Sequence, residues 1–337
     1  MATPPRGSTT TTTTTTKPGY GEVEIRAFAN SSSIATLTSS YPLRLVSPPA
    51  RGHARAAIVF SLTFGGGLVA GDYVDMRVRV QPKARLVLLT QGSTKIYKTP
   101  SRAVCTEQHL TATVDEGAAL VLLPDPVQPF QCSSYSQSQA FYVHPQHSSL
   151  LLLDWVSAGR AARGEAWSFF QWRRRNEVWS LAGDKNNDQK TKDDDDDNNN
   201  NNNNNKAARA KLLLRDNIIL DGHDLASVEH RYRDAMDDLG VFGTLIIRGP
   251  VFDRLARHFL QEFSCLPRIR GKPNHLELAT SSSPAGLTWS AASIRGFVMV
   301  KFGAKEVDEA KRWLREMLVS EGTVEQEFGR YSLLCLQ

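Results

Sequence analysis

The segment RVRVQPKARLVLLTQ, residues 77–91, joins an alternating stretch to a short polar turn and then to a run of aliphatic residues. The same order recurs in LTATVDEGAALVLLPD, residues 110–125, and in FYVHPQHSSLLLLDW, residues 141–155. Alignment of the three segments makes Leu86, Leu120 and Leu150 equivalent, so the unit repeats roughly every 30 residues. Units of this length cannot bury their apolar faces alone and must stack on their neighbours.

Each unit contains two kinds of strand. Residues 74–80, VDMRVRV, alternate between apolar and polar side chains, which is the pattern of a half-buried β-strand. The aliphatic runs are apolar on both faces, which favours strands that are covered on both sides. We therefore expect a mainly β fold, a β-helix-like stack of layered β-hairpins, with residues 69–98 as one of its layers.

A fourth unit is present if a low-complexity string is removed. EVWSLAGD, residues 177–184, supplies the alternating strand, and ARAKLLLRD, residues 208–216, supplies the aliphatic run. The string between them, residues 184–206, lacks apolar side chains, which predicts a disordered Asp/Asn insertion in a turn. The threonine-rich residues 1–19 are likewise expected to form a disordered tail.

The remaining chain divides into two parts, a layered β body over residues 20–235 and an α+β part over residues 236–337. In the second part, VFGTLII (241–247) and GFVMVKF (296–302) indicate strands. Two helices are expected, over residues 250–263 and 306–320, because each segment places apolar residues on one face.

Composition excludes several classes of function. The 337 residues are 41% hydrophobic and 22% charged, as in an ordinary globular protein. The net charge is only +5, and the basic residues are scattered, so we expect no nucleic-acid binding. The sequence has no apolar stretch long enough to span a membrane. The four cysteines form no C-x-x-C pair, which is typical of a reducing compartment, so we expect a cytoplasmic protein.

The glycine-rich stretch TFGGGLVAGD, residues 63–72, allows two interpretations. It loosely fits a dinucleotide fingerprint, but that motif requires a helix after the glycines, and here an alternating strand follows. The other interpretation is a tight backbone corner, because glycine permits positive φ and close backbone approach. The corner would comprise Gly65, Gly66, Gly67 and Gly71. A nucleotide-dependent enzyme that uses the loop from Gly65 to Gly71 remains the alternative.

Four blocks in series resemble the urease accessory protein D family, which is called H in some bacteria. The blocks are GGGLVAGD (65–72), LLTQGSTKIYK (88–98), LLPDPVQPF (122–130) and SAGRAARGEAW (157–167). The resemblance extends over roughly residues 20–320 and implies a non-enzymatic scaffold with a β-helix-like fold. It implies binding to apo-urease and to accessory protein F, which recruits the GTPase accessory protein G carrying nickel.

The resemblance also implies that nickel passes through the interior of the protein in transit, with no tightly bound cofactor. Such a conduit must be hydrated, lined by oxygen ligands and weakly binding, because a dry interior excludes a divalent ion and a tight site would retain it. By motif position, the candidate conduit residues are Asp72, Ser93 and Glu165. Asp125 and Asp154 each follow a repeated aliphatic run and are further candidates. For each of the five residues, a role in a turn or salt bridge is the alternative.

Three other residues bear on these alternatives. Arg160 is expected to be a structural partner for a carboxylate of its block. His144 and His147 flank a Pro-Gln turn at a spacing that could chelate nickel, but a plain surface turn is favoured. A β-rich binding module without a metal role remains the second alternative to the maturation scaffold.

Overall fold

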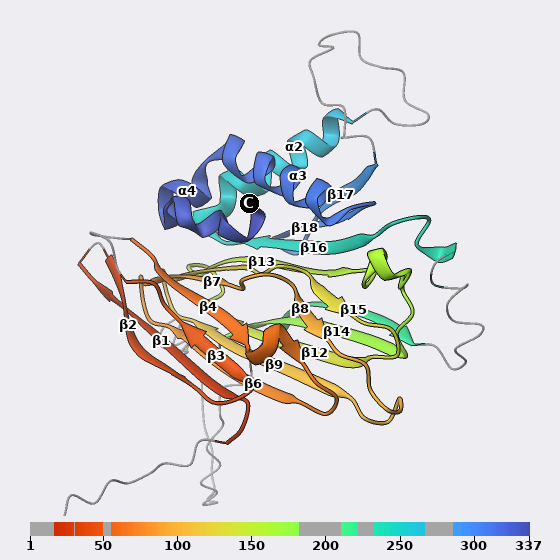
Figure 1. The fold of residues 1–337 in the computed structure, drawn as a ribbon. Helices are drawn as coiled ribbons and strands as arrows, with labels where there is room; N and C mark the ends of the chain where they lie inside the picture. Colours follow the sequence, from red (N-terminus) through yellow and green to blue (C-terminus); the bar gives the residue numbers. More distant parts are fainter. Residues whose placement is uncertain are drawn as a thin grey trace, which may run out of the picture.

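The structure is a computed structural model that describes residues 17–29, 31–49, 55–181, 210–221, 232, 234–266 and 286–337. Within these ranges, two large β-sheets lie face to face, and a layer of helices covers the outer face of one of them (Figure 1). Nearly all of the predicted tail, the predicted Asp/Asn insertion at 184–206 and most of the loop after residue 266 lie outside the described residues.

The first sheet has seven strands in the order β15-β14-β12-β9-β6-β1-β2 among the described residues. Its strands are β1 (Tyr20–Phe28), β2 (Ser31–Ser39), β6 (Tyr73–Val80), β9 (Thr106–Val114), β12 (Ser134–Val143), β14 (Gln171–Ser180) and β15 (Lys211–Asp221). Strands β6, β9, β12 and β14 pair in parallel. They are the alternating strands of successive units, so the units stack in chain order.

The second sheet has eleven strands in the described part of the chain, with the main order β17-β18-β16-β13-β10-β7-β4-β3. These strands are β3 (Leu43–Val46), β4 (Ala57–Thr63), β7 (Arg85–Leu89), β10 (Ala119–Leu123), β13 (Ser149–Ser157), β16 (Val241–Arg248), β17 (Leu287–Ile294) and β18 (Phe297–Ala304). Three short strands beside this path are β5 (Gly67–Leu68), β8 (Thr94–Ile96) and β11 (Val127–Pro129). Because β16 pairs with β13, the C-terminal part extends the sheet of the β body.

The register of the second sheet confirms the alignment of the units. Leu120 lies opposite Leu86 on one side and opposite Leu150 on the other. Side chains of the aliphatic runs alternate between two cores. Leu86 and Leu88 pack between the two sheets, whereas Val87 and Leu89 pack under the helical layer. Burial on both faces explains why these runs are apolar throughout.

The helical layer contains α2 (Asp253–Cys265), α3 (Val307–Glu321) and the short α4 (Thr323–Phe328), and the described chain also has four 3-10 segments. The 3-10 segments are η1 (Phe64–Gly66), η2 (Ala161–Arg163), η3 (Pro250–Phe252) and η4 (Arg330–Leu336). Both predicted helices are confirmed. Of the described helices, none combines the length and the apolarity that a membrane crossing needs.

A mainly β, β-helix-like stack with a small helical C-terminal part is therefore confirmed, with one difference in pairing. The two strands of a unit are not hairpin partners, because the polar turn carries the chain from one sheet to the other. The units of a hairpin stack were expected to pair internally. They pair instead with the units before and after them.

The fourth unit also differs from the prediction. Its second strand, β15, stays in the first sheet as the antiparallel partner of β14. Along β15, buried Leu214 and Asp216 alternate with exposed Arg215 and Asn217, so the strand suits a sheet with one solvent face. The place beside β13 is taken by β16. The predicted insertion still connects neighbouring strand ends, since Ser180 lies opposite Lys211.

Candidate functional site

The four sequence blocks come together on one short parallel ladder. Strand β5 pairs with β8, β8 pairs with β11, and β11 pairs with β13. Each strand lies in or directly before one of the blocks. Segments that are far apart in sequence are therefore neighbours, and the ladder continues the second sheet at the carboxyl ends of β7, β10 and β13.

The glycine-rich stretch forms a backbone corner on this ladder. Gly65, Gly66 and Gly71 have φ angles of 71°, 73° and 81°, which favour glycine. Gly67 is extended, but a Cβ there would lie 2.5 Å from the carbonyl oxygen of Lys95. Strands β5 and β6 follow the corner, so no helix N-terminus is available to hold a phosphate.

Two of the predicted conduit residues lie near this corner. The Asp72 carboxylate accepts a hydrogen bond from the Val69 amide at 2.8 Å and thereby closes the turn before β6. Ser93 is half-buried in the loop before β8. Neither residue is among those that line the interior cavity described below.

Glu165 is held by Arg160, as expected for that arginine. The Arg160 Nε donates to Glu165 Oε2 at 2.8 Å, and its second nitrogen donates to Oε1. The hydrogen bonds from Arg160 lower the pKa of Glu165, against a smaller opposing effect of burial. The amide of Gln131 also donates to Oε2, at 3.2 Å. Because Arg160 additionally stacks on Phe130, 4.0 Å from the ring centre, Glu165 fastens two of the blocks together.

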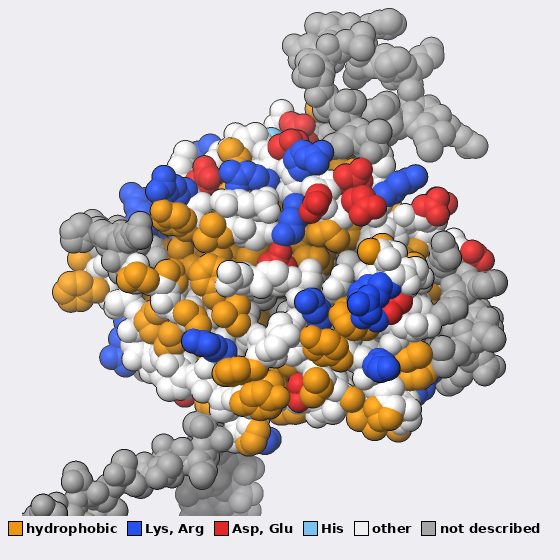
Figure 2. All heavy atoms as spheres, in the orientation of Figure 1, with side chains coloured by type: hydrophobic (Ala, Val, Ile, Leu, Met, Phe, Trp, Pro, Cys, Tyr) orange, Lys and Arg blue, Asp and Glu red, His pale blue; other side chains and the backbone are white. Residues whose placement is uncertain are grey.

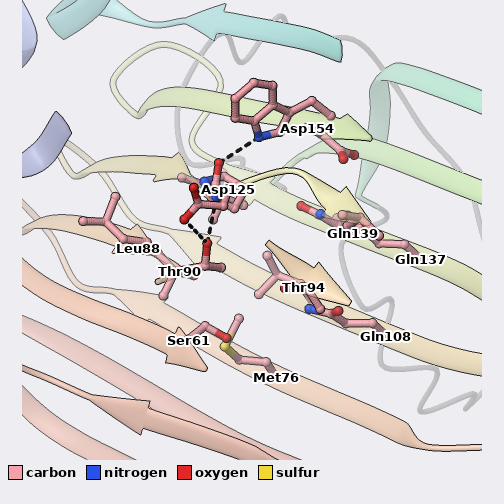
Figure 3. A pocket seen from close by; sticks show the side chains of 16 residues that line it. Ser61, Met76, Leu88, Thr90, Thr94, Gln108, Asp125, Gln137, Gln139 and Asp154 are labelled. Carbon is pink, nitrogen blue, oxygen red and sulfur yellow. Dashed lines mark hydrogen bonds between the residues drawn. The ribbon is translucent and has the colours of Figure 1, made fainter. Parts of the chain in front are cut away.

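Asp125 and Asp154 meet at a cavity between the two sheets. The cavity measures about 50 Å³, which is room for a few water molecules. Its remaining polar lining comes from Ser61, Thr90, Thr94, Gln108, Gln137 and Gln139. Figure 3 shows the glutamines entering from the strands of one sheet and the two aspartates from the other. The structure thus brings together two of the five predicted residues.

The Asp125 carboxylate is 5% exposed and has three partners. Oδ2 accepts hydrogen bonds from the Gly92 amide at 2.8 Å and from the Thr90 hydroxyl at 3.2 Å. Oδ1 contacts Lys311 Nζ of α3 at 2.6 Å. Close by, Cys335 donates its thiol proton to the Thr90 carbonyl, and burial raises the pKa of this thiol to about 12. Cys335 is therefore a protonated thiol here, not a thiolate ligand.

Asp154 is 3% exposed and belongs to a buried polar network. Its Oδ2 accepts a hydrogen bond from Asn176 at 2.6 Å and lies 3.3 Å from Arg174 Nε. Burial raises the pKa of Asp154, and the nearby Arg174 charge only partly opposes this effect. Arg174 has no exposed side-chain surface, and it also donates to Thr244 and Asp216.

Sequence reasoning missed the glutamines. On β12, Gln137 and Gln139 occupy the same inward-facing positions as Tyr135 and Phe141, and both glutamines are buried. Polar residues in the buried register of an otherwise alternating strand were the available signal. The Gln139 Oε1 atom is buried without a hydrogen-bond partner, so this acceptor is satisfied only by a species that enters the cavity, such as water or a cation.

The cavity offers oxygen ligands, some of which are already compensated by protein cations. Within the described residues, no three His, Cys, Asp or Glu side chains gather as a metal-binding group. The histidine pair lies elsewhere, in the turn before β13. There His144 Nδ1 accepts hydrogen bonds from the amides of Gln146 and His147, which leaves the proton of the neutral ring on the other nitrogen. This arrangement supports the surface-turn interpretation.

Exposed apolar side chains surround the glycine corner. Tyr41 is 62% exposed and packs against Phe64, and Val69 is 49% exposed. Figure 2 shows hydrophobic side chains gathered over the sheets, whereas acidic and basic side chains gather over the helical layer.

Comparison with known proteins identifies the family. The sequence pattern described as UreD urease accessory protein matches residues 17–329. The chain belongs to the UreD family of urease accessory proteins. It is 30% identical over 339 residues to urease accessory protein 4 of Cryptococcus neoformans var. grubii, with 90% of each chain covered. It is 29% identical to a ureD-like urease accessory protein of Schizosaccharomyces pombe, with 88% of this chain and 92% of the relative covered.

A third relative, also named UreD, matches a shorter part of the chain. UreD of Anaeromyxobacter sp. is 43% identical over 160 residues, which cover 48% of this chain and 52% of that protein. Membership of the UreD family supports an accessory role in urease maturation. The architecture described above, with its cavity between two sheets, is thus that of a UreD-family chain.

Proposed function

We propose that this chain is a non-catalytic scaffold in urease maturation and that nickel passes through its inter-sheet cavity toward urease. The proposed partners are apo-urease, accessory protein F and, through F, the GTPase accessory protein G. Family membership supports the partners, and the exposed apolar side chains around the glycine corner are suited to protein contacts. Nickel is the cargo in this proposal, and the chain holds no resident cofactor.

The observation that carries the nickel route is that Asp125 and Asp154 both line one cavity, together with other oxygen-bearing side chains. A divalent ion cannot cross an apolar interior without replacing the hydration that it loses. The carboxylates, glutamine amides and threonine hydroxyls here are oxygen ligands, and the space allows the ion to keep part of its water.

The same cavity is built for weak binding. Asp125 is compensated by Lys311, and Asp154 lies beside Arg174, so neither carboxylate presents an uncompensated charge to an ion. Thiolate and imidazole ligands, which bind nickel more tightly, do not line the cavity. Weak binding is what a transit site needs, since the cargo must leave. A transit role for Asp72, Ser93 and Glu165 stays a prediction.

The test is Asp154→Asn, which keeps the side chain's shape but removes its charge. Full-length protein would be assembled with urease and accessory proteins F and G, and both recovery of the complex and nickel content of urease would be measured. We expect intact assembly and reduced nickel loading. Because burial raises the pKa of Asp154, wild-type nickel loading should also weaken on acidification at a higher pH than for an ordinary aspartate.

The matched control is Asp115→Asn, which alters a carboxylate that contacts Arg79 and lies outside both the cavity and the set of conduit candidates. Equal nickel loading by Asp154→Asn and wild type, with assembly intact, would contradict the route through the cavity and favour a binding module without a metal role. A parallel loss of assembly and nickel in Asp154→Asn would assign the residue a structural role instead.

A further inference from the structure

Two lysines form comparable contacts with buried aspartates on different sides of the cavity region. Lys311 Nζ on α3 lies 2.6 Å from Asp125 Oδ1, and the lysine side chain is 19% exposed. Lys301 Nζ on β18 lies 2.9 Å from Asp216 Oδ1, and its side chain is 50% exposed. Both lysines belong to the C-terminal part of the chain. The two lysines differ in the surroundings of the aspartate that each one contacts.

Asp125 lines the cavity directly, whereas Asp216 does not. Between Asp216 and the cavity stands Arg174, which is fully buried and contacts Asp154, Asp216 and Thr244. This arginine is fixed by several partners, so the side of the cavity at Asp154 is closed to a cation from the direction of Lys301. At Asp125, by contrast, the compensating charge is a single lysine held by one contact, which another cation can replace.

We propose that Lys311 is a tethered competitor for the cation position on Asp125, which a divalent ion must displace when it enters or leaves the cavity at this wall. The inference rests on the proposed function of the cavity as a nickel route, and it adds the residue that keeps affinity low there. The ammonium occupies the Oδ1 position, whereas Oδ2 is already engaged by Gly92 and Thr90.

The chemistry of lysine suits displacement. Its ammonium is a compact charge on a flexible four-carbon stem, which can keep its apolar part packed while the head group turns to water. The partial exposure of Lys311 gives that head group a path to solvent. Competition for one carboxylate is a negative coupling between lysine and metal ion, and couplings of this kind are typically about 5- to 150-fold.

The experiment measures Ni²⁺ affinity of the full-length chain by competition with a metal-binding indicator dye. Lys311→Met removes the competitor, and we expect about tenfold tighter Ni²⁺ binding, within the range of ordinary couplings between sites. Lys301→Met is the matched control, because it removes the same charge from another buried aspartate behind Arg174, and its affinity should equal that of wild type. Lys311→Arg keeps the charge and should bind as weakly as wild type.

The gain in Lys311→Met should vanish when Asp125→Asn is added, because no carboxylate is then left to compete for. Equal Ni²⁺ affinities for Lys311→Met and Lys301→Met would overturn the proposal. The proposed function is tested separately by nickel loading of urease with Asp154→Asn. If loading falls but Lys311→Met binds normally, the route stands and the competitor role fails. If loading is unchanged but Lys311→Met binds more tightly, the route fails and the competition stands.

Discussion

Replacement of Arg174 by methionine should strongly destabilise the fold. Arg174 is fully buried, and its guanidinium donates to the Asp154 carbonyl at 2.8 Å, to Thr244 Oγ1 at 2.9 Å and to Asp216. Methionine fills much of the same volume but leaves two buried carboxylates without their shared cation. Removal of one partner from a buried pair typically costs about 3–5 kcal/mol, because the remaining charge is left in a low dielectric.

The loss of stability in Arg174→Met can be compared with that caused by removing the neighbouring Lys301. Its side chain is half exposed, so water compensates most of the loss when Lys301→Met removes its contact with Asp216. Exposed ion pairs contribute about 0.2–1 kcal/mol, several times less than the buried arginine. A domain's total stability is about 5–15 kcal/mol, so Arg174→Met would retain only part of it.

Urea unfolding of the full chain, followed by circular dichroism at 25 °C, measures both costs. Arg174→Lys keeps the charge but not the full set of hydrogen bonds, so it should fall between wild type and Arg174→Met. If Arg174→Met proves no more destabilising than Lys301→Met, the buried network does not hold the two sheets together and the reasoning is wrong.

Two further predictions concern the sequence blocks. Gly67→Ala should cost about 1–3 kcal/mol of stability, because its Cβ would clash with the Lys95 backbone. Gly65→Ala meets open space and should cost less, about 1–2 kcal/mol, through its positive φ alone. Thermal unfolding measures both, and a Gly65→Ala variant less stable than Gly67→Ala would mean that Gly67 is not a point of close approach. Glu165→Gln should destabilise the protein at pH 7. The pKa of Glu165 is lowered in the fold, so its contribution to the free energy of unfolding is complete at pH values above the ordinary glutamate pKa. This contribution is lost as the pH falls through the lowered pKa. The unfolding curves of variant and wild type should therefore converge in acid. A constant difference down to the acid limit would contradict the Glu165–Arg160 contact as its source.

The stacking of units could be predicted because it depends on local patterns. Equivalence of Leu86, Leu120 and Leu150 follows from aligned turns and aliphatic runs, and the sheet register reproduces it. Whether a turn reverses the chain within a sheet or carries it to the facing sheet depends on what covers the second face of the strand. Here the second face is covered by a helical layer that lies far later in the chain. The residues around each turn therefore could not show whether the turn forms a hairpin or crosses to the other sheet.

The candidate site was only partly predictable for the same reason. Asp125 and Asp154 were found because each follows an aliphatic run, and parallel strands in register bring such positions together. Asp72 and Glu165 were candidates by their positions in the resembling blocks, yet the turn amide of Val69 and the guanidinium of Arg160 hold these two carboxylates elsewhere. Side-chain partners of this kind are set by tertiary contacts, which the residue pattern does not encode.

The pairing of β13 with β16 has a consequence for synthesis of the chain. Strand β13 is buried along its whole length, and among the described strands β16 alone covers one of its edges. Translation proceeds from the N-terminus, so the ribosome must complete β14, β15 and the following segment before β16 emerges. During that interval, β13 presents an open aliphatic edge on which another nascent strand can pair. The edge is closed only when β16 arrives, so the interval before that is when the new chain is exposed to aggregation.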